Sequence, residues 1–79
     1  MTQTLATVPF GEPAVIVQIA GDRGFRRRLF ELGFLPGSQA RVLAAAPMGD
    51  PLDVEVGGCR FSLRRAEADS ITVSALAAK

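Results

Sequence analysis

The sequence contains no histidine, tryptophan or tyrosine, and it has a single cysteine, Cys59. With one cysteine the 79-residue chain forms no internal disulfide, and without histidine it lacks the usual ligands of a Cys/His zinc site. General acid–base catalysis uses side chains that titrate near neutral pH, so the missing histidine and tyrosine argue against an enzyme. Hydrophobic residues make up 48% of the chain, so we expect a core of aliphatic side chains and phenylalanine.

A strong charge imbalance is also absent, because nine basic and eight acidic residues leave a formal net charge of +1. Proteins whose affinity rests on phosphate neutralisation are usually far more basic. No apolar run approaches the roughly 18 to 20 residues that span a bilayer, and the first ten residues lack the parts of a signal peptide. Together with the unpaired Cys59, these absences predict a cytoplasmic protein.

The chain length predicts one domain over residues 1–79, near the lower size limit for a core without disulfides or metals. We expect an ordered core at about residues 5–74, with "MTQT" and "SALAAK" as loose ends. Gly57-Gly58 predicts a two-residue hairpin turn, and "RAEAD" a single helical turn. Apolar runs and alternating patterns bounded by turn residues predict five short strands, in "EPAVIVQIAGD", "SQARVLAAAP", "PLDVEVGG", "CRFSLR" and "SITVSA". This mainly β pattern predicts a small five-stranded barrel.

One α-helix is expected at about residues 22–33, after the first long strand. Asp22 is a candidate N-cap, and Gly33 is a candidate left-handed C-cap. Phe25, Leu29 and Leu32 follow at i, i+4 and i+7 and form one apolar stripe. We therefore expect the stripe to close one end of the barrel.

The predicted core combines the inward positions of the helix and strands. The pattern of the first strand is ambiguous, because Ile16 competes with its two neighbours for the inward position. The expected core residues are Val15, Val17, Ile19, Leu29, Leu32, Val42, Val54, Val56, Phe61, Leu63, Ile71 and Val73.

Three segments carry a resemblance to a known family: "RLFELGFLPG", "PMGDPLDVEV" and "LRRAEADSITV". Over about Leu5 to Val73 the chain resembles the FeoA family of ferrous iron transport proteins. The resemblance implies a small SH3-like barrel with a helix inserted after the first long strand. It also implies a non-enzymatic accessory protein of ferrous iron uptake. Such a protein binds and modulates the cytoplasmic part of FeoB, the membrane GTPase permease, and associates with the membrane only through that partner.

The resemblance also raises the possibility of a metal site, because members of the family are described as binding transition metals. Selective sites for ferrous iron or zinc usually draw on imidazole or thiolate ligands. The weak candidates here are three carboxylates and one thiol: Asp50, Asp53, Glu55 and Cys59. Cys59 is expected to be a buried, inert strand residue, and the two strand carboxylates to face solvent. We therefore expect no cofactor and at most weak transition-metal binding.

Two surfaces are candidates for partner binding. Phe30 lies about 140 degrees around the helix from Phe25, on the outer side with Arg26 and Arg27, and its alternative placement is under the loop at residues 34–38. The second candidate is the hairpin tip with Met48, Asp50 and Leu52, where Met48 and Leu52 could instead fold back over the barrel.

Two other functions are compatible with a small barrel: a detached regulatory domain of the metal-responsive repressor type, and a nucleic-acid-binding module. The repressor needs a winged helix, which 79 residues do not accommodate. Arg60, Arg64 and Arg65 could line a basic sheet face, but no exposed aromatic row accompanies them. The neighbouring strand offers Asp53 and Glu55, which favours cross-strand charge pairs. We expect no nucleic-acid binding, and a monomer or weak homodimer.

Overall fold

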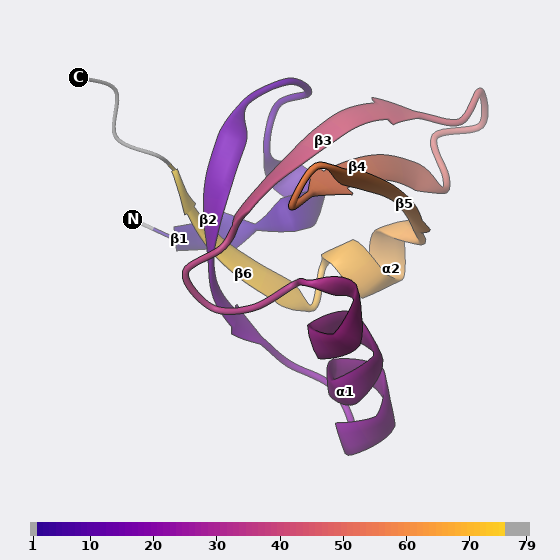
Figure 1. Cartoon of the computed structure of the whole chain (residues 1–79). Coiled ribbons are helices and arrows are strands. Elements are labelled where there is room, and N and C mark those ends of the chain that lie inside the picture. The colour runs from indigo at the N-terminus through magenta and orange to yellow at the C-terminus, as the bar shows by residue number, and fades with distance from the viewer. Residues whose placement is uncertain (1, 76–79) are drawn as a thin grey trace.

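The computed structural model describes residues 2–75, which form one antiparallel sheet with two helices beside it (Figure 1). The strands are β1 (Thr2–Thr4), β2 (Pro13–Ile19), β3 (Gln39–Ala45), β4 (Leu52–Val56), β5 (Cys59–Leu63) and β6 (Ile71–Ala75). The helices are α1 (Arg23–Leu32) and α2 (Arg65–Ala68), with a short 3₁₀ helix, η1 (Leu5–Thr7). The strand order is β1-β6-β2-β3-β4-β5, so β1 and β5 are the edges. The mainly β class with one longer helix is confirmed.

The sheet has six strands where the sequence predicts five. The additional strand is β1, whose residues pair with β6 from Thr2↔Ser74 to Thr4↔Thr72. The segment "MTQT" was expected to be a loose end, but three of its residues form this ladder. The end of "SALAAK", residues 76–79, lies outside the described residues.

Local turn chemistry agrees with the sequence. Gly57 and Gly58 join β4 to β5 with φ angles of 59° and 81°, as expected for a two-residue hairpin loop that needs positive φ at both positions. The register Val56↔Cys59 follows from that turn. The predicted helical turn in "RAEAD" is α2.

Helix α1 begins and ends at the predicted caps. The side chain of Asp22 accepts a hydrogen bond from the Phe25 N–H at 2.8 Å, which satisfies one of the free N–H groups of the first turn. Gly33 adopts a φ of 105° and its N–H bonds to the Leu29 and Phe30 carbonyls. In Figure 1, α1 projects from one end of the sheet, on the same side as α2.

The inward positions of β2 differ from the prediction. Ala14, Ile16 and Ile19 are buried, whereas Val15 is half-buried and Val17 is 44% exposed. The cause is a register shift between Ile16 and Gln18 in the pairing of β2 with β6. Such a bulge adds one residue to the strand, so residues three apart can both face inward.

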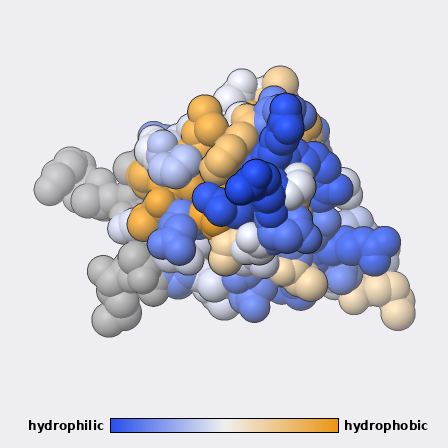
Figure 2. Space-filling model, turned by 90° about the horizontal axis from the view of Figure 1, so that it is seen from below, coloured by the Kyte–Doolittle hydropathy of each residue, from blue (hydrophilic) through white to orange (hydrophobic). Residues whose placement is uncertain are grey.

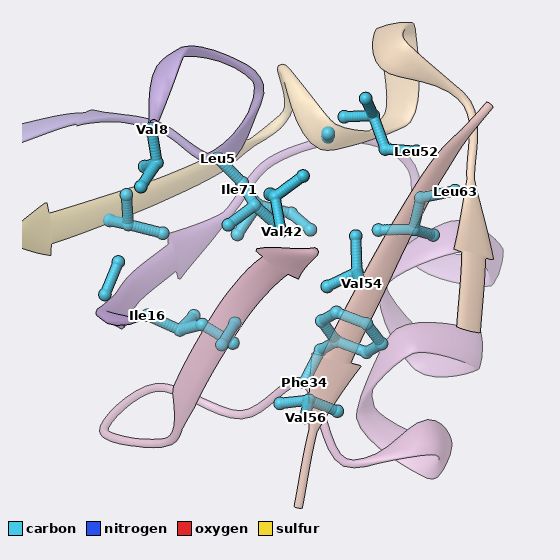
Figure 3. Packing of buried hydrophobic residues seen from close by; sticks show 14 of the residues in the cluster. Leu5, Val8, Ile16, Phe34, Val42, Leu52, Val54, Val56, Leu63 and Ile71 are labelled. Atoms are coloured by element: carbon cyan, nitrogen blue, oxygen red, sulfur yellow. The ribbon is translucent and has the colours of Figure 1, made fainter. Parts of the chain in front are cut away.

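The core residues contributed by α1 and the loop after it also differ from the prediction. Leu29 is fully buried as predicted, but Leu32 is 38% exposed. Its place is taken by Phe34, which follows the αL residue Gly33 and lies beside Val54 and Val56 of β4 in Figure 3. Leu5 and Val8, which were not predicted as core residues, are buried as well. Of the predicted strand residues, Phe61 is half-buried and the remaining ones outside β2 are buried: Val42, Val54, Val56, Leu63, Ile71 and Val73.

Candidate functional site

The outer face of α1 exposes the predicted contact residues Arg26, Arg27 and Phe30. The Phe30 side chain is 37% exposed, so it is not enclosed under the following loop. Arg27 forms an ion pair with Glu31, with 3.6 Å between Nε and Oε2, but both side chains are exposed. Exposed pairs of this kind contribute little to stability, so the arginines remain available to a partner.

Two further apolar side chains, which the sequence pattern did not predict to be exposed, lie on the α1–β3 loop and on β2. Leu35 and Val17 are 45% and 44% exposed. Backbone hydrogen bonds between Ile16 and the Gly37-Ser38 segment hold the α1–β3 loop against β2, which brings the Leu35 loop beside the Val17 strand. Figure 2, seen from the side on which α1 projects, shows hydrophobic residues gathered next to strongly hydrophilic ones. This side of the molecule therefore combines apolar and hydrophilic area, as protein interfaces often do.

At the hairpin tip between β3 and β4, the two apolar residues Met48 and Leu52 differ in exposure. Met48 is 92% exposed, whereas Leu52 is 1% exposed. Leu52 pairs with Ala45 of β3 and Leu63 of β5 and faces the core, so the prediction of Leu52 as a contact residue is wrong. Met48 is the residue that the tip presents to solvent.

Asp50 has a structural role at the same tip. Its carboxylate accepts a hydrogen bond from the Arg65 N–H at 2.9 Å, at the start of α2. The Arg65 Nε donates to the Gly49 carbonyl, also at 2.9 Å. These two bonds from Arg65 therefore hold the tip that carries Met48 against α2.

Charged residues on β4 and β5 pair across the strands, as predicted. Arg60 donates to the carboxylate of Asp53, and Glu55 lies directly opposite Arg60 in the register. The hydrogen bond and charge of Asp53 raise the pKa of Arg60 above its ordinary value. Arg60 is therefore neutralised by its neighbours, whereas Arg64 and Arg65 form none of the ion pairs within residues 2–75. The absence of nucleic-acid binding stays a prediction.

The four weak metal candidates are not brought into one ligand set. The carboxylate of Asp50 bonds to a backbone N–H, and that of Asp53 bonds to an arginine. Cys59 is exposed rather than buried as expected, because it follows the hairpin turn on the edge strand β5. Within residues 2–75, no group of three or more His, Cys, Asp or Glu is placed to hold a metal ion. At most weak metal binding therefore stays a prediction.

A groove of about 560 Å³ lies between α1, α2 and β5, and sequence reasoning did not foresee it. Arg28 and Glu67 close one side through an ion pair of 2.8 Å. The Arg64 N–H donates to the other Glu67 oxygen at 2.9 Å; this bond, and next the Arg28 side chain, lower the pKa of Glu67. The lining residues are Arg28, Leu32, Asp50, Pro51, Phe61, Ser62, Leu63, Arg64 and Glu67. The exposed Leu32 forms part of this wall.

Within residues 2–75, none of the helices is long and apolar enough to cross a bilayer.

Comparison with known proteins connects these features to a family. The FeoA domain model matches residues 3–75. The chain is 38% identical over 69 residues to the "Fe(2+) transport protein A/Fe(2+) transporter FeoB fusion protein" of Porphyromonas gingivalis. That alignment covers 87% of this chain but 8% of the relative, so the chain spans less than a tenth of the fusion protein.

Two solved structures are similar over nearly the whole chain. The FeoA protein of Chlorobium tepidum is 39% identical with a TM-score of 0.90, covering 95% of this chain and 71% of that one. The FeoA of Stenotrophomonas maltophilia, solved with zinc, is 41% identical with a TM-score of 0.77, covering 91% and 89%. It is described as a procaryotic SH3 domain protein and suggested as a bacterial ferrous iron transport activating factor.

Proposed function

Because this chain belongs to the FeoA domain family, whose fold is SH3-like, we propose that it is a non-enzymatic accessory protein of ferrous iron uptake. It binds the cytoplasmic part of a FeoB-type permease and modulates it. The protein acts from the cytoplasmic side and reaches the membrane through that partner.

The observation that carries this proposal is the fusion relative of Porphyromonas gingivalis, in which a segment similar to this chain belongs to the same polypeptide as FeoB. Covalent linkage raises the effective concentration of one binding module at the other without any new contact. A permanent linkage of this kind is useful when the two parts work in contact. For a separate chain, the same contact requires a binding surface.

The outer face of α1 is the proposed contact surface, together with the hairpin tip at Met48. Phe30 supplies a rigid apolar anchor, and Arg26 and Arg27 flank it with positive charge. Aromatic and arginine side chains are enriched among residues that dominate binding energy. At the tip, Met48 supplies a flexible apolar contact, and Asp50 holds the loop in place through its bond to α2.

A double variant, Phe30→Ala with Arg27→Glu, tests this surface. Both side chains are exposed, so the melting temperature should stay close to that of the wild type. Affinity for the permease's cytoplasmic domain, measured by titration calorimetry, should fall at least about tenfold, or 1.4 kcal/mol. The matched control is Arg41→Glu, which also reverses one arginine but lies on β3 and not on α1.

Two results would count against the proposal. Absence of binding by the wild-type chain to the permease's cytoplasmic domain would remove the proposed function itself. Equal binding by wild type and double variant would keep the function but place the contact elsewhere on the molecule.

A further inference from the structure

The second edge of the sheet, β5, has backbone groups that β4 does not use. Because the two-residue turn makes Val56↔Cys59 a hydrogen-bonded pair, the alternate pairs Glu55↔Arg60 and Asp53↔Ser62 are not hydrogen-bonded. The N–H and C=O groups of Arg60 and Ser62 therefore point away from β4. β5 ends the strand order, so these groups lie along its outer edge.

The groove described above runs beside this edge. Three consecutive residues that line it, Phe61, Ser62 and Leu63, belong to β5. Leu32 of α1 and Pro51 of the hairpin tip add apolar surface, and Leu32 is 38% exposed with Phe61 half-buried. An apolar side chain of a bound segment can therefore fit into the groove beside this edge.

The charged groups that line the groove differ in the partners that they have. Glu67 is occupied by Arg28 and by the Arg64 N–H, and Asp50 by the Arg65 N–H. Within residues 2–75, the Arg64 guanidinium takes part in no ion pair. The lining as a whole is balanced, with Arg28 and Arg64 against Asp50 and Glu67. Arg64 is its unpaired cation, and a carboxylate on the occupant would complement it.

We propose that β5 and its groove bind an extended segment of a partner protein as an added strand. The segment bonds to the backbone of Arg60 and Ser62 and places an apolar side chain against Leu32 and Phe61. An acidic residue next to that apolar residue pairs with Arg64. Strand addition draws affinity from the backbone bonds and specificity from the alternate side chains.

This inference does not rest on the proposed function. Leu32 lies about 160 degrees around α1 from Phe30, so the groove and the Phe30 surface occupy opposite sides of the helix. The hairpin tip borders the groove through Asp50 and Pro51, so the two surfaces are separate at α1 only. Either binding activity can be absent without the other.

The test uses the blocked peptide Ac-Thr-Glu-Leu-Glu-Thr-NH2 and the isotope-labelled full chain, followed by NMR. We expect saturable shifts of the Arg60 and Ser62 amide signals, with a dissociation constant on the order of 1 mM. The peptide Ac-Thr-Lys-Leu-Lys-Thr-NH2 should bind more weakly, because lysine meets Arg64 with like charge. Equal binding of the two peptides would overturn the charge requirement.

Two protein variants form a matched pair. Arg64→Glu and Arg23→Glu change the formal net charge by the same amount, but only Arg64 lines the groove. We expect Arg64→Glu to weaken peptide binding about fivefold and Arg23→Glu less than about twofold. Equal effects would show general attraction between net charges, which contradicts the proposed site.

Backbone pairing is tested by Ser62→Pro. Proline is tolerated on edge strands, and here it removes an N–H that faces away from β4. Peptide binding should be lost while the melting temperature changes little. If that variant does not fold, peptides N-methylated at the leucine or at the two glutamates give the same test, because the N–H that faces β5 belongs to the leucine in a parallel added strand and to the glutamates in an antiparallel one. Binding unchanged by every one of these N-methylations would overturn strand addition. Shifts at Arg60 and Ser62 that grow with protein concentration alone would identify a second copy as the occupant, which also overturns the proposal.

Discussion

Glu67 is a single carboxylate that joins both helices. One oxygen accepts the Arg64 N–H at the start of α2, and the other binds the Arg28 guanidinium from α1. These bonds lower the pKa of Glu67 in the folded protein. A lowered folded pKa means that the stabilisation is fully present above the unfolded value of 4.5 and is lost as pH falls through the folded pKa.

Replacement of Glu67 by glutamine should therefore make the free energy of unfolding depend less on pH in the acid range. At neutral pH we expect Glu67→Gln to lower the free energy of unfolding by about 1 kcal/mol. Near pH 3 the two proteins should become more alike, since the wild-type carboxylate loses its charge. Urea denaturation at both pH values measures this difference. Glu31→Gln, in the exposed pair with Arg27, is the control; if it shows the same pH dependence, the Glu67 bonds are not the cause.

Leu29 and Leu32 give a second comparison between single residues. Leu29 is fully buried and Leu32 is 38% exposed. Leu29→Ala should cost roughly 2–5 kcal/mol through lost burial and a cavity, which is enough to unfold much of a domain this small. Leu32→Ala should cost less than about 1.5 kcal/mol, because its side chain is already partly in water. Circular dichroism melts distinguish the two; equal losses would contradict the assignment of Leu29 to the core and Leu32 to the groove wall.

At the scale of single elements, the sequence was most informative where a structure depends on neighbouring residues. The caps Asp22 and Gly33, and the turn at Gly57-Gly58, were predicted because each bond forms within a few residues of chain. The inward positions of β2 were not predictable in this way. The bulge that exposes Val17 lies in the pairing with β6, a strand more than 50 residues away in the sequence.

Helix α1 contains one glycine that its backbone does not require. Gly24 has an ordinary helical backbone, and an added Cβ would meet only the Asp22 Oδ1, at 3.6 Å. Gly24→Ala should therefore raise the free energy of unfolding by about 0.5–1 kcal/mol. Gly33, with its φ of 105°, should respond in the opposite direction: Gly33→Ala should lower it by about 1 kcal/mol or more. Thermal melts of both variants provide the measurement, and a loss of stability in Gly24→Ala would show that the first turn of α1 is strained.

At the scale of the whole molecule, residues distant in sequence decide which groups meet. The groove joins α1, the β3–β4 tip, β5 and α2, and no local pattern indicates that these four segments converge. Leu32 shows the difficulty: the helical pattern assigned it to the core, but in the structure it is 38% exposed and lines the groove. The outer face of α1 was easier to foresee, because helical geometry alone separates Phe30 from the buried Leu29.

The same arrangement bears on metal binding. Asp50 and Asp53 are engaged by other protein groups, and within residues 2–75 potential ligands do not cluster. We expect anaerobic titration calorimetry with ferrous iron at neutral pH to show no binding tighter than about 1 μM. A tight, stoichiometric isotherm that is abolished by Asp50→Ala or Cys59→Ala would contradict this. A zinc ion shared by carboxylates of two chains in a crystal would not.

The position of α1 at one end of the sheet also gives the molecule an electric polarity. The helix carries four arginines and one glutamate, a formal charge of +3, whereas the whole chain carries +1, so the remaining residues carry −2. A nearly neutral protein therefore has an uneven distribution of formal charge, with the positive excess on the projecting helix. In the field of an acidic surface, the molecule turns α1 forward before contact is made, and this orientation raises the rate of productive encounter. Added salt reduces that torque over distances beyond about 8–10 Å.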